Sequence, residues 1–210
     1  MIKKNWKVLL ITSVATLLPV LAGLILWNRL PEQIPSHWNA AGEVDGWSSK
    51  PFVVFGLPLL MVAIQWLCVI GTGTDPKKEA HPQKILHLVL WIIPVISTVL
   101  FAITYAVALG QEVRVEVVMP VLIGVVLAIV GNYLPKCKQN YTIGIKIPWT
   151  LNSEENWNKT HRLAGWVWSI GGLVIALTGF LGGFEIFLGV VLVMVLVPLI
   201  YSYLLHRKGI

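Results

Sequence analysis

Charged residues are scarce in this sequence. Asp, Glu, Lys and Arg make up 12% of the 210 residues, whereas hydrophobic residues make up 56%. A soluble domain carries about 25% charged residues, so this chain has too few charges to solvate an ordinary surface. The composition therefore predicts an integral membrane protein.

Cysteine is scarce as well. The chain has two, Cys68 within an apolar run and Cys137 within a basic loop. Two cysteines in such different surroundings do not make a disulfide framework. We therefore expect both side chains to be thiols.

Motifs of known catalytic chemistry are missing from the sequence. It contains no HExxH zinc motif, no CxxC, no GxSxG elbow and no glycine-rich phosphate loop. Ser169 and His161 lie eight residues apart on one predicted helix, and that separation of more than two turns is too long for a direct hydrogen bond. We therefore expect no enzymatic activity and no cofactor.

Long apolar stretches dominate what is present. Six of them reach or approach the roughly 20 residues that a helix needs to cross a bilayer. The sequence therefore predicts an all-α integral membrane protein with six transmembrane helices, at about 8–29, 52–72, 86–109, 117–134, 163–181 and 184–205.

The basic residues are unevenly divided between the predicted loops. With six spans, the two termini and the even-numbered loops carry 13 of the 16 Lys and Arg residues, and the other side carries only Arg29, Lys50 and Arg114. The positive-inside rule then places the N-terminus and the C-terminus in the cytoplasm. The formal charge of +6 thus reflects the membrane topology and does not indicate direct binding of nucleic acid. Some of the Lys and Arg side chains should contact the headgroups of membrane lipids.

A polar segment, LPEQIPSHWNAAGEVDGWSSKP, joins the first two predicted spans outside the cytoplasm. Gly42 and Gly46 predict two turns with positive φ, and hence a compact loop or small hairpin with Trp side chains at the membrane surface. His37, Glu43 and Asp45 together suggest a metal site, but no second His lies nearby, so we favour carboxylates that cap turns and expect no metal. The candidate residues for binding an extracytoplasmic ligand are Ile34, Pro35, His37, Trp38, Asn39, Gly42, Glu43, Asp45, Gly46 and Trp47.

A second polar segment, NYTIGIKIPWTLNSEENWNKTHRLAGW, precedes the fifth predicted span in the cytoplasm. Asn152 and Glu155 are spaced as a capping box, with Ser153 as an alternative cap. A helix that begins here places Trp157 and His161 on one face. The segment is therefore expected to be the cytoplasmic start of the fifth helix, preceded by a structured turn.

Both polar segments resemble known bacterial membrane proteins. The first resembles an N-terminal domain with the pattern P..IP.HWN..G..D...SK, and the second resembles the signature of the SdpI family, roughly N..IG.R.PWTL..E..W..TH...G. Lys146 departs from the family's usual Arg and keeps the charge without the bidentate geometry. The residues that match this cytoplasmic motif, for partner binding or structure, are Asn140, Gly144, Lys146, Pro148, Trp149, Thr150, Leu151, Glu155, Trp157, His161 and Arg162.

The resemblance extends over nearly the whole chain and implies a domain division. It implies a two-span unit over residues 1–85, with the extracytoplasmic loop at 30–51. It also implies a four-span SdpI-like unit over residues 86–210, with the cytoplasmic motif at 135–162. The expected location is the bacterial plasma membrane, as a multi-pass protein.

The resemblance also implies a function. The family's best-known member protects a toxin-producing cell from its own secreted killing peptide and holds a small autorepressor at the cytoplasmic face. The implied partners are a secreted toxin peptide and an ArsR-like cytoplasmic repressor. An exporter of a peptide or lipid is the alternative, and a structural protein that organises lipid is a third. The shortage of ionisable residues in the middle of the spans argues against the exporter.

Overall fold

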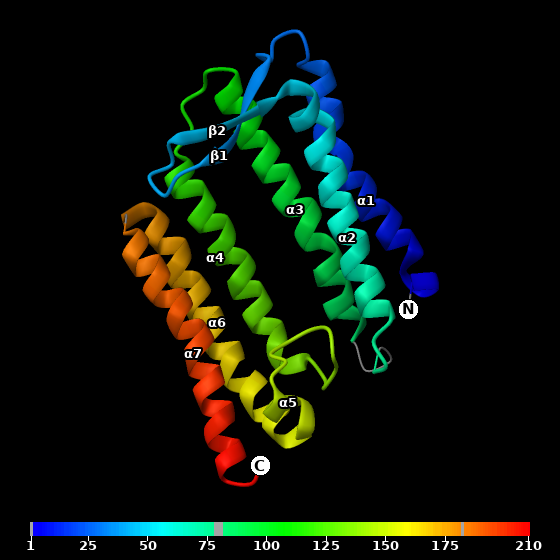
Figure 1. The fold of residues 1–210 in the computed structure, drawn as a ribbon, viewed down its shortest axis with the longest axis vertical. Coiled ribbons are helices and arrows are strands. Elements are labelled where there is room, and N and C mark those ends of the chain that lie inside the picture. Colours follow the sequence, from blue (N-terminus) through cyan, green and yellow to red (C-terminus); the bar gives the residue numbers. More distant parts are fainter. Residues whose placement is uncertain (1, 78–81, 182) are drawn as a thin grey trace. The chain divides into compact units, whose positions relative to one another are not determined.

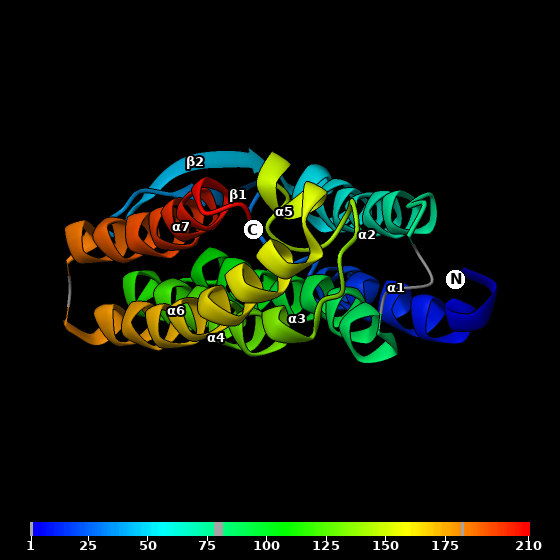
Figure 2. The same ribbon diagram turned by 90° about the horizontal axis from the view of Figure 1, so that it is seen from below.

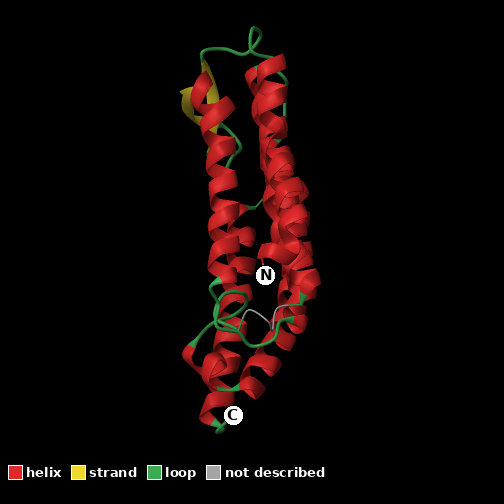
Figure 3. Ribbon diagram, turned by 90° about the vertical axis from the view of Figure 1, so that its right-hand side faces the viewer, coloured by secondary structure: helices red, strands yellow, loops and turns green. Residues whose placement is uncertain are grey.

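The computed structural model describes residues 2–77, 82–181 and 183–210. Lys78, which counts toward the predicted topology, lies outside them. The elements are α1 (Ile2–Ile25), β1 (Gln33–Trp38), β2 (Val44–Ser49), a π-helical turn (Phe52–Gly56), α2 (Leu57–Gly73), α3 (Gln83–Ala108), α4 (Val115–Tyr133), a 3-10 turn (Leu134–Lys136), α5 (Pro148–Asn152), α6 (Glu154–Leu181) and α7 (Phe184–Arg207). Figure 3 shows that helix predominates and that the strands form one short pair.

Six of the described helical segments are long and apolar enough to cross a membrane. This agrees with six spans in a multi-pass membrane protein. The first helix ends at Ile25, before the predicted residue 29, because the chain turns where Arg29 N–H donates to the carbonyl of Leu26. The fifth long helix begins at Glu154, ahead of the apolar span at residue 163, as the capping residues of the polar segment predicted.

The chain divides into two compact units. The first contains residues up to Ile70 together with His87–Glu116, and the second contains Gly71–Leu86 together with Val117–Ile210. The first unit thus holds α1, the strands, most of α2 and most of α3, and the second holds most of α4 and all of α5, α6 and α7.

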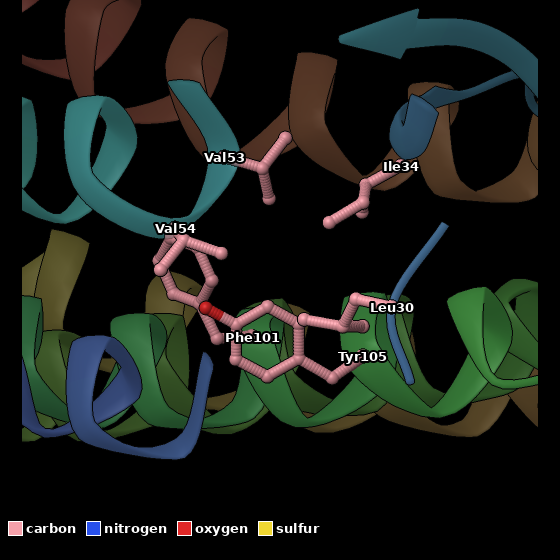
Figure 4. Packing of buried hydrophobic residues seen from close by; sticks show 6 residues of the cluster. All are labelled: Leu30, Ile34, Val53, Val54, Phe101 and Tyr105. Carbon is pink, nitrogen blue, oxygen red and sulfur yellow. The ribbon is translucent and has the colours of Figure 1, made fainter. Parts of the chain in front are cut away.

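The core of the first unit joins the strand pair to the helices. Its buried residues come from the turn after α1, from β1, from the start of α2 and from α3, and they are Leu30, Ile34, Val53, Val54, Phe101 and Tyr105. Figure 4 shows Ile34 and Val53 pointing toward one another, with Phe101 and Tyr105 below them. Because Ile34 is wholly buried in this cluster, the hairpin is held against the helix ends and does not hang free.

Polar side chains also tie the first unit together. The amide of Gln65 on α2 donates to Thr12 Oγ1 on α1 (2.7 Å) and to the carbonyl of Leu90 on α3 (3.2 Å). The Tyr105 hydroxyl donates to the carbonyl of Pro19 (3.1 Å). Hydrogen bonds between apolar helices hold them in one register, so these side chains have a packing role.

The second unit is built on close contacts between backbones. A Cβ added at Gly172 on α6 would lie 2.5 Å from the carbonyl oxygen of Gly124 on α4, and one added at Gly131 would lie 2.5 Å from the backbone nitrogen of Ser169. Small residues at these positions let the two helices approach to backbone contact. Figures 1 and 2 both show α6 and α7 side by side as an antiparallel pair, which Trp168 Nε1 strengthens by donating to the carbonyl of Met194 (2.9 Å).

Candidate functional site

The first polar segment, between the first two long helices, forms an antiparallel β-hairpin. Residues Gln33 to Trp38 pair with Val44 to Ser49, and the register shifts on both sides of His37. The Asn39 side chain holds the turn, because its carbonyl oxygen accepts from the N–H groups of Ala41 (2.9 Å) and Glu43 (3.0 Å). An Asn that bonds its own backbone in this way organises a turn, which explains Asn39 without a ligand.

The two glycines of the hairpin have different roles. Gly42 has a φ of +80°, as expected for a turn, but Gly46 has no positive φ, so the prediction there was wrong. Gly46 lies in β2 opposite His37, where an added Cβ would be 2.8 Å from the Cβ of His37. The strand needs glycine there for space and not for conformation.

One face of the hairpin packs inward. On this face Ile34 is buried and Trp38 is half-buried; Pro35, which pairs with Trp47 on the other face, is buried as well. Next to the strands, Lys50 is buried, pairs with Glu32 (2.8 Å) and lies over the ring of Trp27. These contacts seat the hairpin on the first unit, so Ile34, Pro35 and Lys50 are not free to bind a ligand.

The opposite face is open. Trp47 is 57% exposed, and the exposed His37 and Asp45 side chains hydrogen-bond to each other. Glu43 is also exposed and accepts from the Asn39 amide (2.9 Å). The structure thus brings an aromatic ring, an imidazole and two carboxylates onto one small, rigid hairpin. Within the described residues no three His, Cys, Asp or Glu side chains are grouped as they would be to hold a metal.

The candidate motif of the second polar segment begins with a loop built around Asn140. This side chain is almost fully buried. Its amide donates to the carbonyls of Lys138 and Ile143 (both 2.8 Å), and its oxygen accepts from the N–H groups of Thr142 and Ile143. Both polar atoms of the Asn140 side chain therefore form hydrogen bonds that stabilise the loop.

Trp157 and His161 form the interior of the same region. Both are buried, their rings stack at 4.0 Å, and Trp157 Nε1 donates to the carbonyl of Cys137 (2.7 Å). His161 accepts from Ile145 N–H at Nε2 (2.9 Å) and donates from Nδ1 to the carbonyl of Trp157. An imidazole that accepts at one nitrogen and donates at the other is neutral. Gly144, with a φ of +117°, leaves room for this ring.

The short helix α5 covers the next part of the motif. Pro148 begins it, and the Thr150 hydroxyl donates to the carbonyl of Ile145 (2.8 Å). Leu151 packs against the buried cluster around Trp157. On α7, the Trp149 ring packs against Tyr203 in a tilted arrangement and stacks on His206, with ring centroids 5.1 and 6.0 Å apart. Part of the predicted turn before α6 is thus a short helix, because proline suits the first position of a helix.

The N-cap residue of α6 is the alternative that the sequence offered, Ser153, and not Asn152. The helix begins at Glu154, and the Ser153 hydroxyl accepts from the N–H of Asn156 (3.1 Å). Glu155 pairs with Lys159 one turn later (2.7 Å) on the exposed side of the helix.

Of the motif's charged residues, Lys146 and Arg162 are exposed. They lie in the loop before α5 and in α6, outside the packed interior. The structure therefore divides the motif into a buried scaffold and a set of exposed side chains, among them Lys146, Glu155 and Arg162, and only the exposed ones can meet a partner without unfolding.

Two buried residues were missed by the sequence reasoning. Asp75, after α2, accepts from Tyr141 N–H (2.9 Å) and from the Thr142 hydroxyl (2.8 Å). Asn156 accepts from the Ser202 hydroxyl (2.6 Å) and thus ties α6 to α7. The position of Asn156 next to Trp157, on the inner face of the helix, could have indicated that Asn156 is buried. Asp75 gave no local signal, because its partners lie far along the chain.

Comparison with known proteins adds a relationship over the whole chain. The sequence is 30% identical over 202 residues to "Immunity protein SdpI" of Bacillus subtilis (strain 168), which covers 96% of this chain and 93% of the relative. No solved structure matches the chain. A domain of unknown function, DUF1648, matches residues 14–62, which include the hairpin. The SdpI/YfhL protein family matches residues 136–202, which include the Asn140 loop, Trp157 and His161. With this match and a relative aligned along almost its full length, the chain belongs to the SdpI/YfhL protein family.

Proposed function

We propose that this protein is an immunity protein that protects a bacterial cell from a secreted antimicrobial peptide. The observation that carries the proposal is the full-length relationship to a protein named for immunity. The absence of charged residues from the middle of the predicted spans argues against an ion-coupled exporter. Blocking or binding the peptide at the membrane surface needs no such residues.

The exposed face of the hairpin is our candidate for peptide recognition. Trp47 supplies a large, exposed aromatic surface on a backbone that is fixed by strand pairing and by the buried Ile34. A rigid aromatic side chain loses little entropy on binding, and such residues dominate the energy of many interfaces. The His37–Asp45 pair lies on the same hairpin and adds polar groups that a peptide backbone can meet.

Substitution of this face should reduce protection. A strain that lacks the protein is challenged with the peptide fraction of its parent's culture medium, and survival is counted with each variant supplied from a plasmid. Trp47→Ala should weaken peptide binding about thirtyfold, from roughly 2 kcal/mol of lost contact, and lower survival accordingly. Asp45→Ala should have a smaller effect in the same direction.

The control for this test is Trp6→Ala, which removes an equally exposed Trp from α1. Protein in the membrane must be equal for all variants. Full survival with both Trp47→Ala and Asp45→Ala would show that the exposed face of the hairpin does not recognise the peptide. A strain that lacks the protein and still survives the challenge would overturn immunity itself.

The proposed topology places the hairpin outside and the Asn140 loop inside. With Cys68→Ser as background, Ser49→Cys should react with a membrane-impermeant maleimide in intact cells, whereas Asn152→Cys should react only after lysis. Both positions are exposed. Native Cys137 should stay silent, because burial raises the pKa of its thiol to about 11 and the thiolate is the reactive form. The reverse labelling pattern would contradict the proposed recognition of an external peptide.

A further inference from the structure

A cavity of about 320 Å³ lies in the first unit beside the hairpin. Its near wall is the inner side of the hairpin tip, with Trp38, Gly42 and Val44, and its far wall runs from Val107 at the end of α3 to Glu116 at the start of α4. The volume is at the lower end of the roughly 300–1,000 Å³ of ligand pockets, which suits a side chain or two. None of the far-wall residues was among the candidates from the sequence.

The cavity has apolar walls and an acidic rim. Val44, Val107 and Val113 contribute to its walls, and Glu112 and Glu116 are both exposed carboxylates on its lining. Arg114 pairs with Glu116 (3.2 Å), but its side chain is 75% exposed. An exposed ion pair of this kind contributes little energy and exchanges readily. With two carboxylates and one guanidinium, the rim carries a net negative charge.

The cavity is formed before any ligand arrives. A Cβ added at Gly42 would lie 2.9 Å from the backbone nitrogen of Glu116, so the hairpin tip is seated against the start of α4. Trp38 Nε1 is buried in the same wall without a hydrogen-bond partner in the described part of the chain. A buried donor without an acceptor is costly, so a carbonyl group that reached this nitrogen would be bound favourably.

We propose that this cavity binds a basic side chain of a peptide. The aliphatic stem lies against the valines, the cation meets Glu112 and Glu116, and a carbonyl of the peptide accepts from Trp38 Nε1. That the natural ligand is the secreted toxin peptide rests on the proposed immunity function. That the cavity binds a basic side chain does not depend on that function.

The test uses the full-length protein in nanodiscs of phosphatidylcholine at physiological salt. The probes are two fluorescein-labelled octapeptides, one alternating Gly and Lys and the other alternating Gly and Gln, with binding to empty discs subtracted. The Lys peptide should bind at least tenfold more tightly than the Gln peptide. Glu112→Gln should weaken binding of the Lys peptide about tenfold, and Glu112→Gln with Glu116→Gln should weaken it further.

The matched control is Glu185→Gln, which removes an equal charge from an exposed carboxylate in the first turn of α7, outside the cavity. It should leave binding unchanged. Equal binding of the two peptides, or equal losses from Glu112→Gln and Glu185→Gln, would overturn the proposal. Displacement of the Lys peptide when phosphatidylethanolamine is added to the discs would assign the cavity to a lipid amine and also overturn it.

The same variants separate this proposal from the immunity function. If Glu112→Gln leaves binding of the Lys peptide intact while Trp47→Ala abolishes survival, the cavity proposal fails and immunity stands. If Glu112→Gln weakens binding while a strain without the protein survives the challenge, the cavity proposal stands and immunity fails.

Discussion

Replacing Gly172 with alanine is expected to remove most of the folded protein from the membrane. The new Cβ would lie 2.5 Å from the carbonyl oxygen of Gly124 and 2.9 Å from the Cα of Ala128. Both are atoms of the α4 backbone, so no flexible side chain can move aside, and the two helices must separate. Overpacking costs about 1–3 kcal/mol where side chains can adjust, and we expect at least the upper value here. The measurement is the free energy of unfolding of the purified protein, beside its level in membranes.

Gly189→Ala is the matched control for this prediction. It adds the same methyl group to a helix, but no atom of the described residues lies within 4 Å of the new Cβ. Because alanine has the better helix propensity, Gly189→Ala should be neutral or raise stability by up to about 1 kcal/mol. Similar stability for the two variants would show that α4 and α6 do not pack at Gly172 as described.

Trp157→Ala should strongly destabilise the fold, and with it every function that depends on the fold. The side chain is 0% exposed, stacks on His161 and donates to the carbonyl of Cys137. Removing a buried Trp typically costs about 3–5 kcal/mol, a large part of the 5–15 kcal/mol of a typical domain. Thermal unfolding followed by circular dichroism would measure the loss.

Trp166→Ala provides the comparison on the same helix, since that side chain is 68% exposed. It should change stability far less. If Trp157→Ala unfolds at the temperature of the wild type, the buried cluster is not the scaffold of the motif. Arg162→Glu, at an exposed position, should keep the fold and is therefore the substitution with which capture of a cytoplasmic repressor can be tested.

The motif of the second polar segment separates into buried and exposed residues. From the sequence, Trp157 and His161 were as good candidates for partner binding as Lys146 and Arg162. The structure buries the first two and leaves the second two exposed. A repressor that docks on this motif must use its exposed side chains, among them Lys146, Glu155 and Arg162.

Local features were largely predictable from the sequence. The six apolar helices appear where hydrophobic length predicts them, because a run of apolar residues reports the environment of a helix directly. The hairpin turn at Gly42 was predicted from its residue types, whereas the bulge that places Gly46 opposite His37 was not. A bulge depends on the pairing of two strands, and no residue type announces it.

By itself the sequence determined the membrane class, the helices and the family motif, because composition, apolar length and residue order are properties of the chain alone. The tertiary structure decided which residues are available for function. It brings Asp75 to Tyr141, His161 to Ile145, and the hairpin tip to Glu116. Whether a polar side chain is satisfied or free depends on partners that lie far away in the sequence. For this reason the buried motif and the cavity beside Trp38 became visible only in the folded chain.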